Sequence, residues 1–349
     1  MNKSAFGRIP AGKIPSSGSK LSRIGAGITP KGALIASGVV AALAAAALYN
    51  RRETTVAERN TPPTGSFVEV DGVDLHYIAR GTGRPLVLLH GNGVPLQDMI
   101  VSGLFDRSVE AGYRVIAFDR PGYGYSSRPS DRMWTPREQG DLFAHALATL
   151  KIEQPVVLGH SWGTMVALAM ALDHPESVAA LVLLSGYYYP TVRPDALPQL
   201  PTAAPWLGTL FAHTLTPLIA RLFGPLQVKA SFSPAPVSPW FADFPARMSL
   251  RPSQIRAASI EGAIMVPGAA TISKRYGELD LPVVIMAGDG DKIAWPERHA
   301  VLMHHEIARS VLRVVPGVGH MIHYDATDEV VDGIRDADQR SRQATPMAA

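Results

Sequence analysis

The run Val156-Val157-Leu158-Gly159-His160-Ser161-Trp162-Gly163 decides the predicted fold, because a short apolar strand leads directly into a serine flanked by glycines. Small residues two places before and two places after Ser161 allow a tight turn between a strand and a helix. Trp162–Asp173 continues with apolar residues at helical spacing. The pattern therefore predicts a turn that exposes the Ser161 hydroxyl, next to a helix N-terminus whose N–H groups favour developing negative charge.

Alternating strand and helix signals surround this motif. The first two of eight short strand-like runs flank Asp71-Gly72, which is a strong hairpin signal. The later runs are continuously apolar, as is typical of strands covered on both faces, and helical segments such as 136–150 separate them. The eight runs are residues 67–70, 73–78, 85–89, 115–118, 156–158, 181–184, 283–287 and 311–315. We predict an α/β fold whose mostly parallel, eight-stranded sheet is flanked by helices.

The alternation stops between about residues 187 and 278, and this stretch predicts an inserted, mainly helical cap. It contains many prolines and no run that resembles a strand. Its large apolar residues are Trp206, Phe211, Phe223, Phe232, Trp240 and Phe241. We expect the folded domain to span residues 65–336, with a flexible tail over 337–349.

Charge is distributed unevenly along the chain. The first 52 residues hold eight basic residues and no acidic one, which leaves 25 basic and 30 acidic residues in the rest. The net charge of +3 therefore comes from the N-terminal arm. A nucleic-acid-binding function is not expected, since it would need a basic face on the folded domain.

The N-terminal region divides into three predicted segments. Residues 1–32 are rich in Gly, Ser and basic side chains and predict a disordered arm. Residues 33–50 predict an apolar helix, which is a membrane anchor, a cleaved export signal or an Ala-rich soluble helix. Basic residues before the apolar run outnumber the pair after it, so the catalytic domain is expected outside the cytoplasm, either anchored or exported. Residues 51–64 read as a linker.

A serine hydroxyl needs a base to act as a nucleophile, and the sequence offers candidates. His320 ends the Gly-rich loop that follows the last strand, and His323 is the alternative base. A base of this kind needs a carboxylate partner, for which Asp291 and Asp289 follow the strand at 283–287. The order serine, aspartate, histidine is the order used by hydrolases that carry this turn.

Two backbone N–H groups are candidates for an oxyanion hole, the site that stabilises a tetrahedral intermediate. The N–H of Trp162 is the first, because this residue follows the serine. The second is the N–H of Asn92, with Gly93 as the alternative, in a loop whose glycines allow close approach to a substrate. His90 is expected to shape that loop, and residues 119–126 read as a structural turn bordering the pocket.

Residues 66–335 resemble the α/β-hydrolase superfamily, especially the capped branch related to epoxide hydrolases and haloperoxidases. The resemblance rests on five motifs in order, which are His90 to Gly93, Asp119 to Ser126, Gly159 to Gly163, Gly288 to Asp291, and Gly319-His320. It implies the α/β-hydrolase fold, and it implies Asp291 as the catalytic acid, since the family places this residue three positions after a glycine that ends the strand. Epoxide hydrolases carry aspartate where this chain has Ser161, so the comparison favours acyl transfer.

The sequence thus predicts a serine hydrolase with Ser161 as nucleophile, His320 as base and Asp291 as the partner of His320. The expected substrate is a small or medium hydrophobic carboxylic ester, and the mechanism needs neither a metal nor an organic cofactor. Amide or lactone hydrolysis, perhydrolysis at the same site, and a small-molecule receptor function are the alternatives. The absence of cysteine excludes a cysteine nucleophile and a thiolate zinc site.

Overall fold

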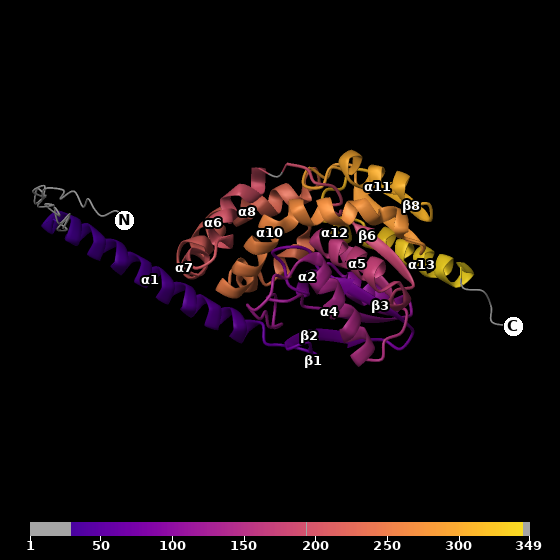
Figure 1. Ribbon diagram of the computed structural model, residues 1–349, viewed down its shortest axis with the longest axis horizontal. Coiled ribbons are helices and arrows are strands. Elements are labelled where there is room, and N and C mark those ends of the chain that lie inside the picture. Colours follow the sequence, from indigo (N-terminus) through magenta and orange to yellow (C-terminus); the bar gives the residue numbers. More distant parts are fainter. Residues whose placement is uncertain (1–28, 193, 345–349) are drawn as a thin grey trace, which may run out of the picture. The chain divides into compact units, whose positions relative to one another are not determined.

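The computed structural model describes residues 29–192 and 194–344, and its centre is an eight-stranded sheet (Figure 1). The strand order is β1-β2-β4-β3-β5-β6-β7-β8. Strand β2 pairs antiparallel with both β1 and β4, and all other neighbours are parallel. The strands are β1 Ser66–Val70, β2 Val73–Arg80, β3 Arg84–Leu89, β4 Tyr113–Phe118, β5 Val156–His160, β6 Ala180–Leu184, β7 Val283–Gly288 and β8 Ser310–Val315. The predicted fold class and the eight predicted strands are confirmed.

Helices cover both faces of the sheet, so the sheet is the middle of three layers. One core joins the sheet to α4 Pro136–Thr149, α5 Trp162–Asp173 and α11 Ala300–Glu306. The other joins it to α2 Gln97–Val101, α3 Leu104–Glu110, α12 Ile322–Asp325 and α13 Thr327–Ala344. Burial on both faces explains why the central strands are almost continuously apolar.

Local signals explain where several elements begin and turn. Asp71 and Gly72 both have positive φ, 51° and 76°, as the two-residue hairpin between β1 and β2 requires. Thr135 caps α4 by accepting a hydrogen bond from the N–H of Glu138, and Pro136 occupies the first helical turn.

The stretch predicted as a cap is helical, and Figure 1 shows α6, α7, α8 and α10 lying together beside the sheet domain. The short helix η1 Pro175–Ser177 precedes β6. Between β6 and β7 the chain forms η2 Pro194–Gln199, α6 Leu200–Ala203, α7 Leu207–His213, α8 Leu215–Phe232, η3 Pro239–Asp243, α9 Ala246–Ser249, α10 Pro252–Ile272 and η4 Ser273–Glu278. The short helix η5 Pro296–Arg298 follows β7. Helix α10 packs against α5, so the cap is held to the domain beside the serine-bearing turn.

The chain divides into two packed units, residues 1–42 and residues 43–349. Helix α1 Pro30–Asn60 runs through this boundary, and its apolar part is long enough to cross a membrane and is not buried. The linker predicted at 51–64 is wrong for most of its length, because α1 stays helical to Asn60. Glu53 and Glu58 form ion pairs with Arg247 and Arg251 of the cap, which stabilise this end of the helix. Residues 1–28, where the disordered arm was predicted, lie outside the described residues.

The C-terminal boundary also differs from the prediction. Helix α13 continues through Ala344, whereas a flexible tail was expected from residue 337. Ala337 is buried and Asp338 binds Arg84 and Arg342, so packing and ion pairs stabilise a segment whose composition is polar.

Candidate active site

Ser161 lies in a strained turn between β5 and α5. Its φ of 52° and ψ of −117° are unusual for a residue with a side chain, and such strain is common at functional positions. A Cβ at position 159 would lie 2.5 Å from the backbone of Gly163, and one at position 163 would lie 2.2 Å from the carbonyl oxygen of Leu89. Glycine is therefore required at both positions for the turn to pack against β3.

Asp291 and His320 come together at the carboxyl ends of β7 and β8. The Nδ1 of His320 lies 2.8 Å from Oδ2 of Asp291, and Oδ1 of Asp291 accepts hydrogen bonds from the N–H groups of Ile293 and Ala294. Burial raises the pKa of Asp291, but the facing imidazole and these hydrogen bonds outweigh it, so the net pKa is lowered. Asp291 is therefore an ionised partner that can orient His320 and support its positive charge.

The two competing residues have other partners. Asp289 is exposed and accepts a hydrogen bond from the N–H of Gly317. His323 is buried and its Nε2 lies 2.8 Å from Oδ2 of Asp98. The structure thus brings Asp291 and His320 together, and neither alternative contacts the pair.

His160, which directly precedes Ser161, contacts the loop that carries His320. The ring centroids of His160 and His320 are 5.1 Å apart, and Nε2 of His160 donates a hydrogen bond of 3.0 Å to the carbonyl oxygen of His320. No hydrogen bond joins the Ser161 hydroxyl to His320 in this structure. Catalytic hydrogen bonds of this type often form only when substrate binds.

The loop after β3 lies against the serine. A Cβ at position 91 would lie 3.2 Å from Cβ of Ser161, so the loop backbone approaches this serine closely. Within the described residues, neither the N–H of Asn92 nor that of Trp162 donates a hydrogen bond. Both are therefore available to a substrate oxygen. The Asn92 side chain donates instead to the carbonyl oxygen of Ala258 in α10.

A buried ion pair fixes this loop. The guanidinium of Arg120 donates to the carbonyl oxygens of His90 and Gly91, both at 2.9 Å, and to both oxygens of Glu261 in α10. His90 completes the frame, because its Nδ1 donates to the Gly91 carbonyl oxygen while its Nε2 accepts from the N–H of Arg120. Burial and the Arg120 charge lower the pKa of His90 to about 3, so this imidazole is neutral.

Glu261 was missed by the sequence analysis, although a signal for it exists. It is the only acidic residue in α10, and a carboxylate in the middle of a largely apolar helix needs a buried partner. Arg120 was expected only to belong to a structural turn. The structure shows that it also holds the loop that carries the candidate oxyanion N–H of Asn92.

Glu261→Gln is expected to lower the free energy of unfolding by about 3–5 kcal/mol, because it leaves the charge of Arg120 buried without a counter-ion. Glu278→Gln is the matched control, since Glu278 forms an exposed pair with Arg275 and should cost at most about 1 kcal/mol. Urea unfolding of both variants checks this. A loss below about 1 kcal/mol for Glu261→Gln would show that the buried pair is not a main support of the loop.

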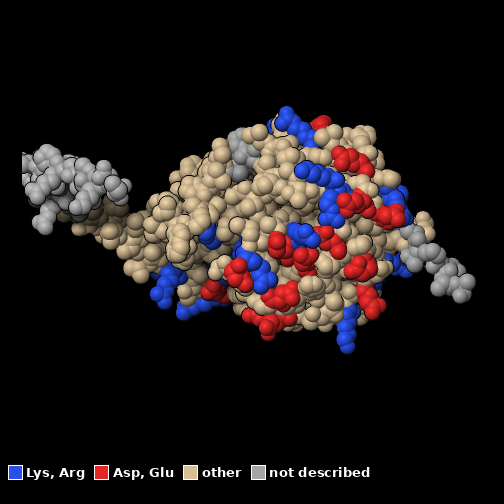
Figure 2. Space-filling view, viewed as in Figure 1, with Lys and Arg blue, Asp and Glu red and all other residues tan. Residues whose placement is uncertain are grey.

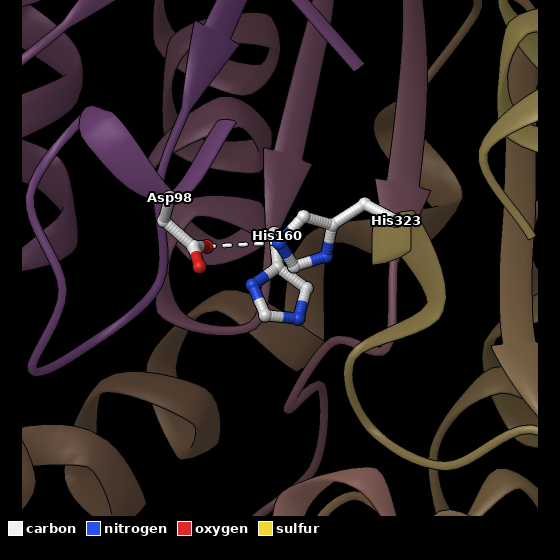
Figure 3. Close-up of side chains that lie close together, drawn as sticks. All are labelled: Asp98, His160 and His323. Carbon is white, nitrogen blue, oxygen red and sulfur yellow. Dashed lines mark hydrogen bonds and ion pairs between the residues drawn. The ribbon is translucent and has the colours of Figure 1, made fainter. Parts of the chain in front are cut away.

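Behind the serine lies a second buried polar cluster, formed by Asp98, His160 and His323 (Figure 3). Asp98 accepts from His323 and, through Oδ1, from the hydroxyl of Tyr324 at 3.0 Å. The rings of His160 and His323 lie 4.3 Å apart. Burial and the neighbouring histidines hold the pKa of His160 well below its ordinary value, so His160 is neutral and donates to the loop of His320.

This cluster is the one group of ligand-type side chains, among the described residues, that is close enough to share a metal ion. Its chemistry fits a hydrogen-bond network better. Both oxygens of Asp98 already accept hydrogen bonds, and Nε2 of His160 is engaged by a carbonyl oxygen. A metal would have to break the short contact between Asp98 and His323, so we interpret the cluster as a support for the catalytic loops.

Acid should weaken the fold through Asp98. Burial raises the pKa of Asp98, but His323, His160 and Tyr324 lower it by a larger amount. The net pKa of Asp98 is therefore below its ordinary value. The stability that ionised Asp98 contributes is therefore present above about pH 4 and is lost as the pH falls through its depressed pKa. Asp98→Asn should be less stable than the wild type at pH 7, and urea unfolding should show the difference shrinking toward pH 3. A difference independent of pH would contradict this.

Two surface hollows have linings that do not include the candidate catalytic residues. One, of about 440 Å³, is lined by residues that include Tyr125, Ser126 and Arg251. The other, of about 580 Å³, lies at the C-terminal end of α8 and is lined by residues from Pro225 to Val237. Neither contains Ser161 or His320. We place the candidate site at the converging side chains, because catalysis depends on their geometry rather than on the largest open volume.

Comparison with known proteins identifies the family and the fold. A family model described as "alpha/beta hydrolase fold" matches residues 84–327. The 2-hydroxymuconate semialdehyde hydrolase of Pseudomonas sp. (strain CF600) is 35% identical over 128 residues, which cover 37% of this chain and 45% of that relative. This chain therefore matches less than half the length of that relative.

Solved structures show the same fold. An esterase from Exiguobacterium antarcticum has a TM-score of 0.63 and 22% identity, covering 78% of this chain and 98% of its own. A bacterial membrane phospholipase A has a TM-score of 0.62 and 22% identity, covering 89% of this chain and 99% of its own. At 22% identity, these two structures show that the chain shares their fold.

Proposed function

The chain belongs to the α/β-hydrolase family of hydrolases, and from this premise we propose that it cleaves carboxylic esters through Ser161, His320 and Asp291. The observation that supports the proposal most is the buried contact between His320 and Asp291, which leaves Nε2 of the imidazole for a serine at the family's nucleophile position. The hydrolase and esterase among the similar proteins support the reaction class.

In the proposed reaction, the Ser161 oxygen attacks the ester carbonyl carbon while Nε2 of His320 takes the hydroxyl proton. The N–H groups of Asn92 and Trp162 hold the oxygen that becomes negative, and each is worth about 3 kcal/mol in the transition state. His320 then gives its proton to the leaving alcohol. Water attacks the acyl-enzyme with His320 again as base, which releases the acid and restores Ser161.

A fluorophosphonate probe, which reacts with activated serines, tests the proposal. We expect the wild type and Ser177→Ala to be labelled and Ser161→Ala to remain unlabelled. Ser177 is a fair control because its hydroxyl bonds only the nearby carbonyl oxygen of His174. An unlabelled wild type, as a small-molecule receptor would give, or labelling that persists in Ser161→Ala, would reject the assignment.

The preferred substrate is the second part of the proposal. A panel of esters, amides and lactones of graded chain length should give the highest kcat/KM for hydrophobic esters, because Phe232 of the cap is buried against Met321, next to the candidate base. Faster turnover of an amide or lactone would correct the reaction class while leaving the catalytic residues in place.

We also propose that residues 33–49 anchor the chain in a membrane. Helix α1 is long and apolar enough to span a bilayer, and its apolar window is not buried. Val40 lies within that window and is exposed.

Val40→Arg should release much of the chain from membranes, because an arginine near the centre of a spanning helix costs about 2.5–3.5 kcal/mol. The measurement is the fraction that remains with membranes after carbonate extraction. Val314→Arg, on the exposed edge strand β8, makes the same chemical change outside α1 and should leave that fraction unaltered. A wild-type chain that is fully extracted, or that has lost residues 33–49, would exclude the anchor.

A further inference from the structure

Helix α8 carries an apolar stripe that faces outward. Each of its five members has another member three or four residues away, which places them on one face of the helix. They are Leu215, Ile219, Leu222, Phe223 and Leu226. All five are exposed, and Leu222 and Leu226 are 72% and 66% exposed. The outer face of a cap helix is thus as apolar as a face that normally packs into a core.

The neighbouring helix α7 extends this stripe into a larger surface. Helices α7 and α8 pack together, and Trp206, Leu207 and Leu210 are also exposed, Trp206 by 91%. Between residues 200 and 245 the charged residues are Arg221, Lys229 and Asp243. Figure 2 shows the result, since basic and acidic side chains gather over the sheet domain while the area over α6 to α8 is largely without charge. Contiguous apolar areas of this kind mark interaction sites.

The end of the apolar run of α1 is joined to this surface. Asn50, directly after the run, is buried and its Nδ2 donates to the carbonyl oxygens of His213 and Thr214, at the junction of α7 and α8. Arg221 of α8 donates to Oδ1 of Asn50, and its guanidinium lies 5.0 Å from the ring centre of Tyr49. The exposed side chains of Leu48 and Tyr49 therefore continue the apolar surface of the cap.

We propose that the apolar surface formed by Leu48, Tyr49, Trp206, Leu207, Leu210 and the α8 stripe binds the surface of a lipid bilayer. Residues 33–49, which are apolar enough for the interior of a bilayer, end at this surface. A bilayer that contains residues 33–49 would therefore contact the cap next to residue 49. The composition fits an interfacial location, where an amphipathic helix lies in the plane of the membrane and aromatic rings lie at the headgroups. Arg51 and Arg52 follow the run and are exposed to anionic headgroups.

Helix α8 also connects this surface to the catalytic loop. At its other end, the carbonyl oxygen of Ser231 accepts hydrogen bonds from the N–H groups of His320 and Met321. The hollow of about 580 Å³ lies at the same end of α8, and Pro225, Pro234, Pro236 and Val237 contribute to its lining. This step rests on the proposed ester hydrolysis. A surface bound to the bilayer indicates that the substrate is a lipid-soluble ester, which the enzyme takes from the bilayer.

Single-cysteine probes can test the surface, because the natural chain has no cysteine. The full chain carrying Leu222→Cys, Leu226→Cys or, as control, Glu153→Cys is labelled with an environment-sensitive fluorophore and placed in phosphatidylcholine–phosphatidylglycerol vesicles. A bound face lies about 5–10 Å into the headgroup region, so the probes at 222 and 226 should shift to the blue and lose on the order of half their emission to nitroxide-labelled lipids. The probe at exposed Glu153 should do neither.

Each other outcome overturns the proposal. Probes at 222 and 226 that behave like the probe at 153 would place the surface in water. Probes that are shielded but insensitive to nitroxide lipids would show that a protein, or a second copy of this chain, covers it.

Rates of hydrolysis of two esters distinguish a failure of this inference from a failure of the proposed function. Leu222→Glu combined with Leu226→Glu should lower hydrolysis of a long-chain ester dissolved in vesicles on the order of tenfold, while kcat/KM for a water-soluble short ester changes less than about twofold. Equal losses on both esters, or no loss on either, would contradict a role in substrate uptake. If the wild type hydrolyses neither ester, the proposed function fails, and lipid quenching still decides the surface.

Discussion

Ser161→Ala is expected to lower kcat for ester hydrolysis by on the order of 10⁵–10⁶-fold. The serine supplies the atom that becomes acylated, and losing the nucleophile of such a triad costs about as much as losing the whole triad. Residual turnover should come from the oxyanion N–H groups alone. Single-turnover and steady-state assays with a chromogenic ester measure the loss, and a drop below about tenfold would show that another group attacks the substrate.

Ser161→Gly provides a matched control for folding. Glycine adopts the positive φ of this turn without steric conflict, so this variant should be as inactive as Ser161→Ala but more stable by about 1–3 kcal/mol. Urea unfolding compares the two variants. Equal stability would mean that the turn does not hold the residue under strain, and activity in the glycine variant would remove Ser161 from the mechanism.

Asp291→Asn is expected to lower kcat by roughly 10⁴-fold while the chain remains folded. The amide cannot hold His320 in the required tautomer or support its positive charge, which is the function of the carboxylate. The loss should appear in kcat rather than in KM, since the carboxylate does not touch the substrate. Steady-state kinetics with the chromogenic ester check the split.

Asp289→Asn makes the same change two residues away and decides between the two acids. Its carboxylate accepts a hydrogen bond from the N–H of Gly317 and does not reach His320, so the variant should lose about 1 kcal/mol of stability and little activity. If Asp289→Asn were the inactive variant and Asp291→Asn the active one, the assignment of the acid would be reversed.

Periodic patterns in the sequence determined the sheet and the positions of the strongest motifs. Eight short apolar runs predicted eight strands, and the glycines around Ser161 predicted its turn, because burial and backbone sterics act on a few adjacent residues. The predicted ends of two helices were wrong, because contacts with distant residues determine where these helices end. Helix α1 extends to Asn60 and α13 to Ala344 through ion pairs with residues distant in the chain, which no local pattern reveals.

The tertiary structure alone decided which polar residues meet. The family resemblance implied Asp291 rather than Asp289, and the path of the loop after β7 places the carboxylate of Asp291 against His320. Asp98 and Glu261 gain their importance from partners far away in sequence, because a buried charge must find its counter-ion wherever the fold places it. The sequence by itself therefore determined the strands and the turn at Ser161, and it predicted the three candidate catalytic residues. The supports of the loop after β3 and the apolar surface of the cap depend on contacts that exist only after the chain has folded.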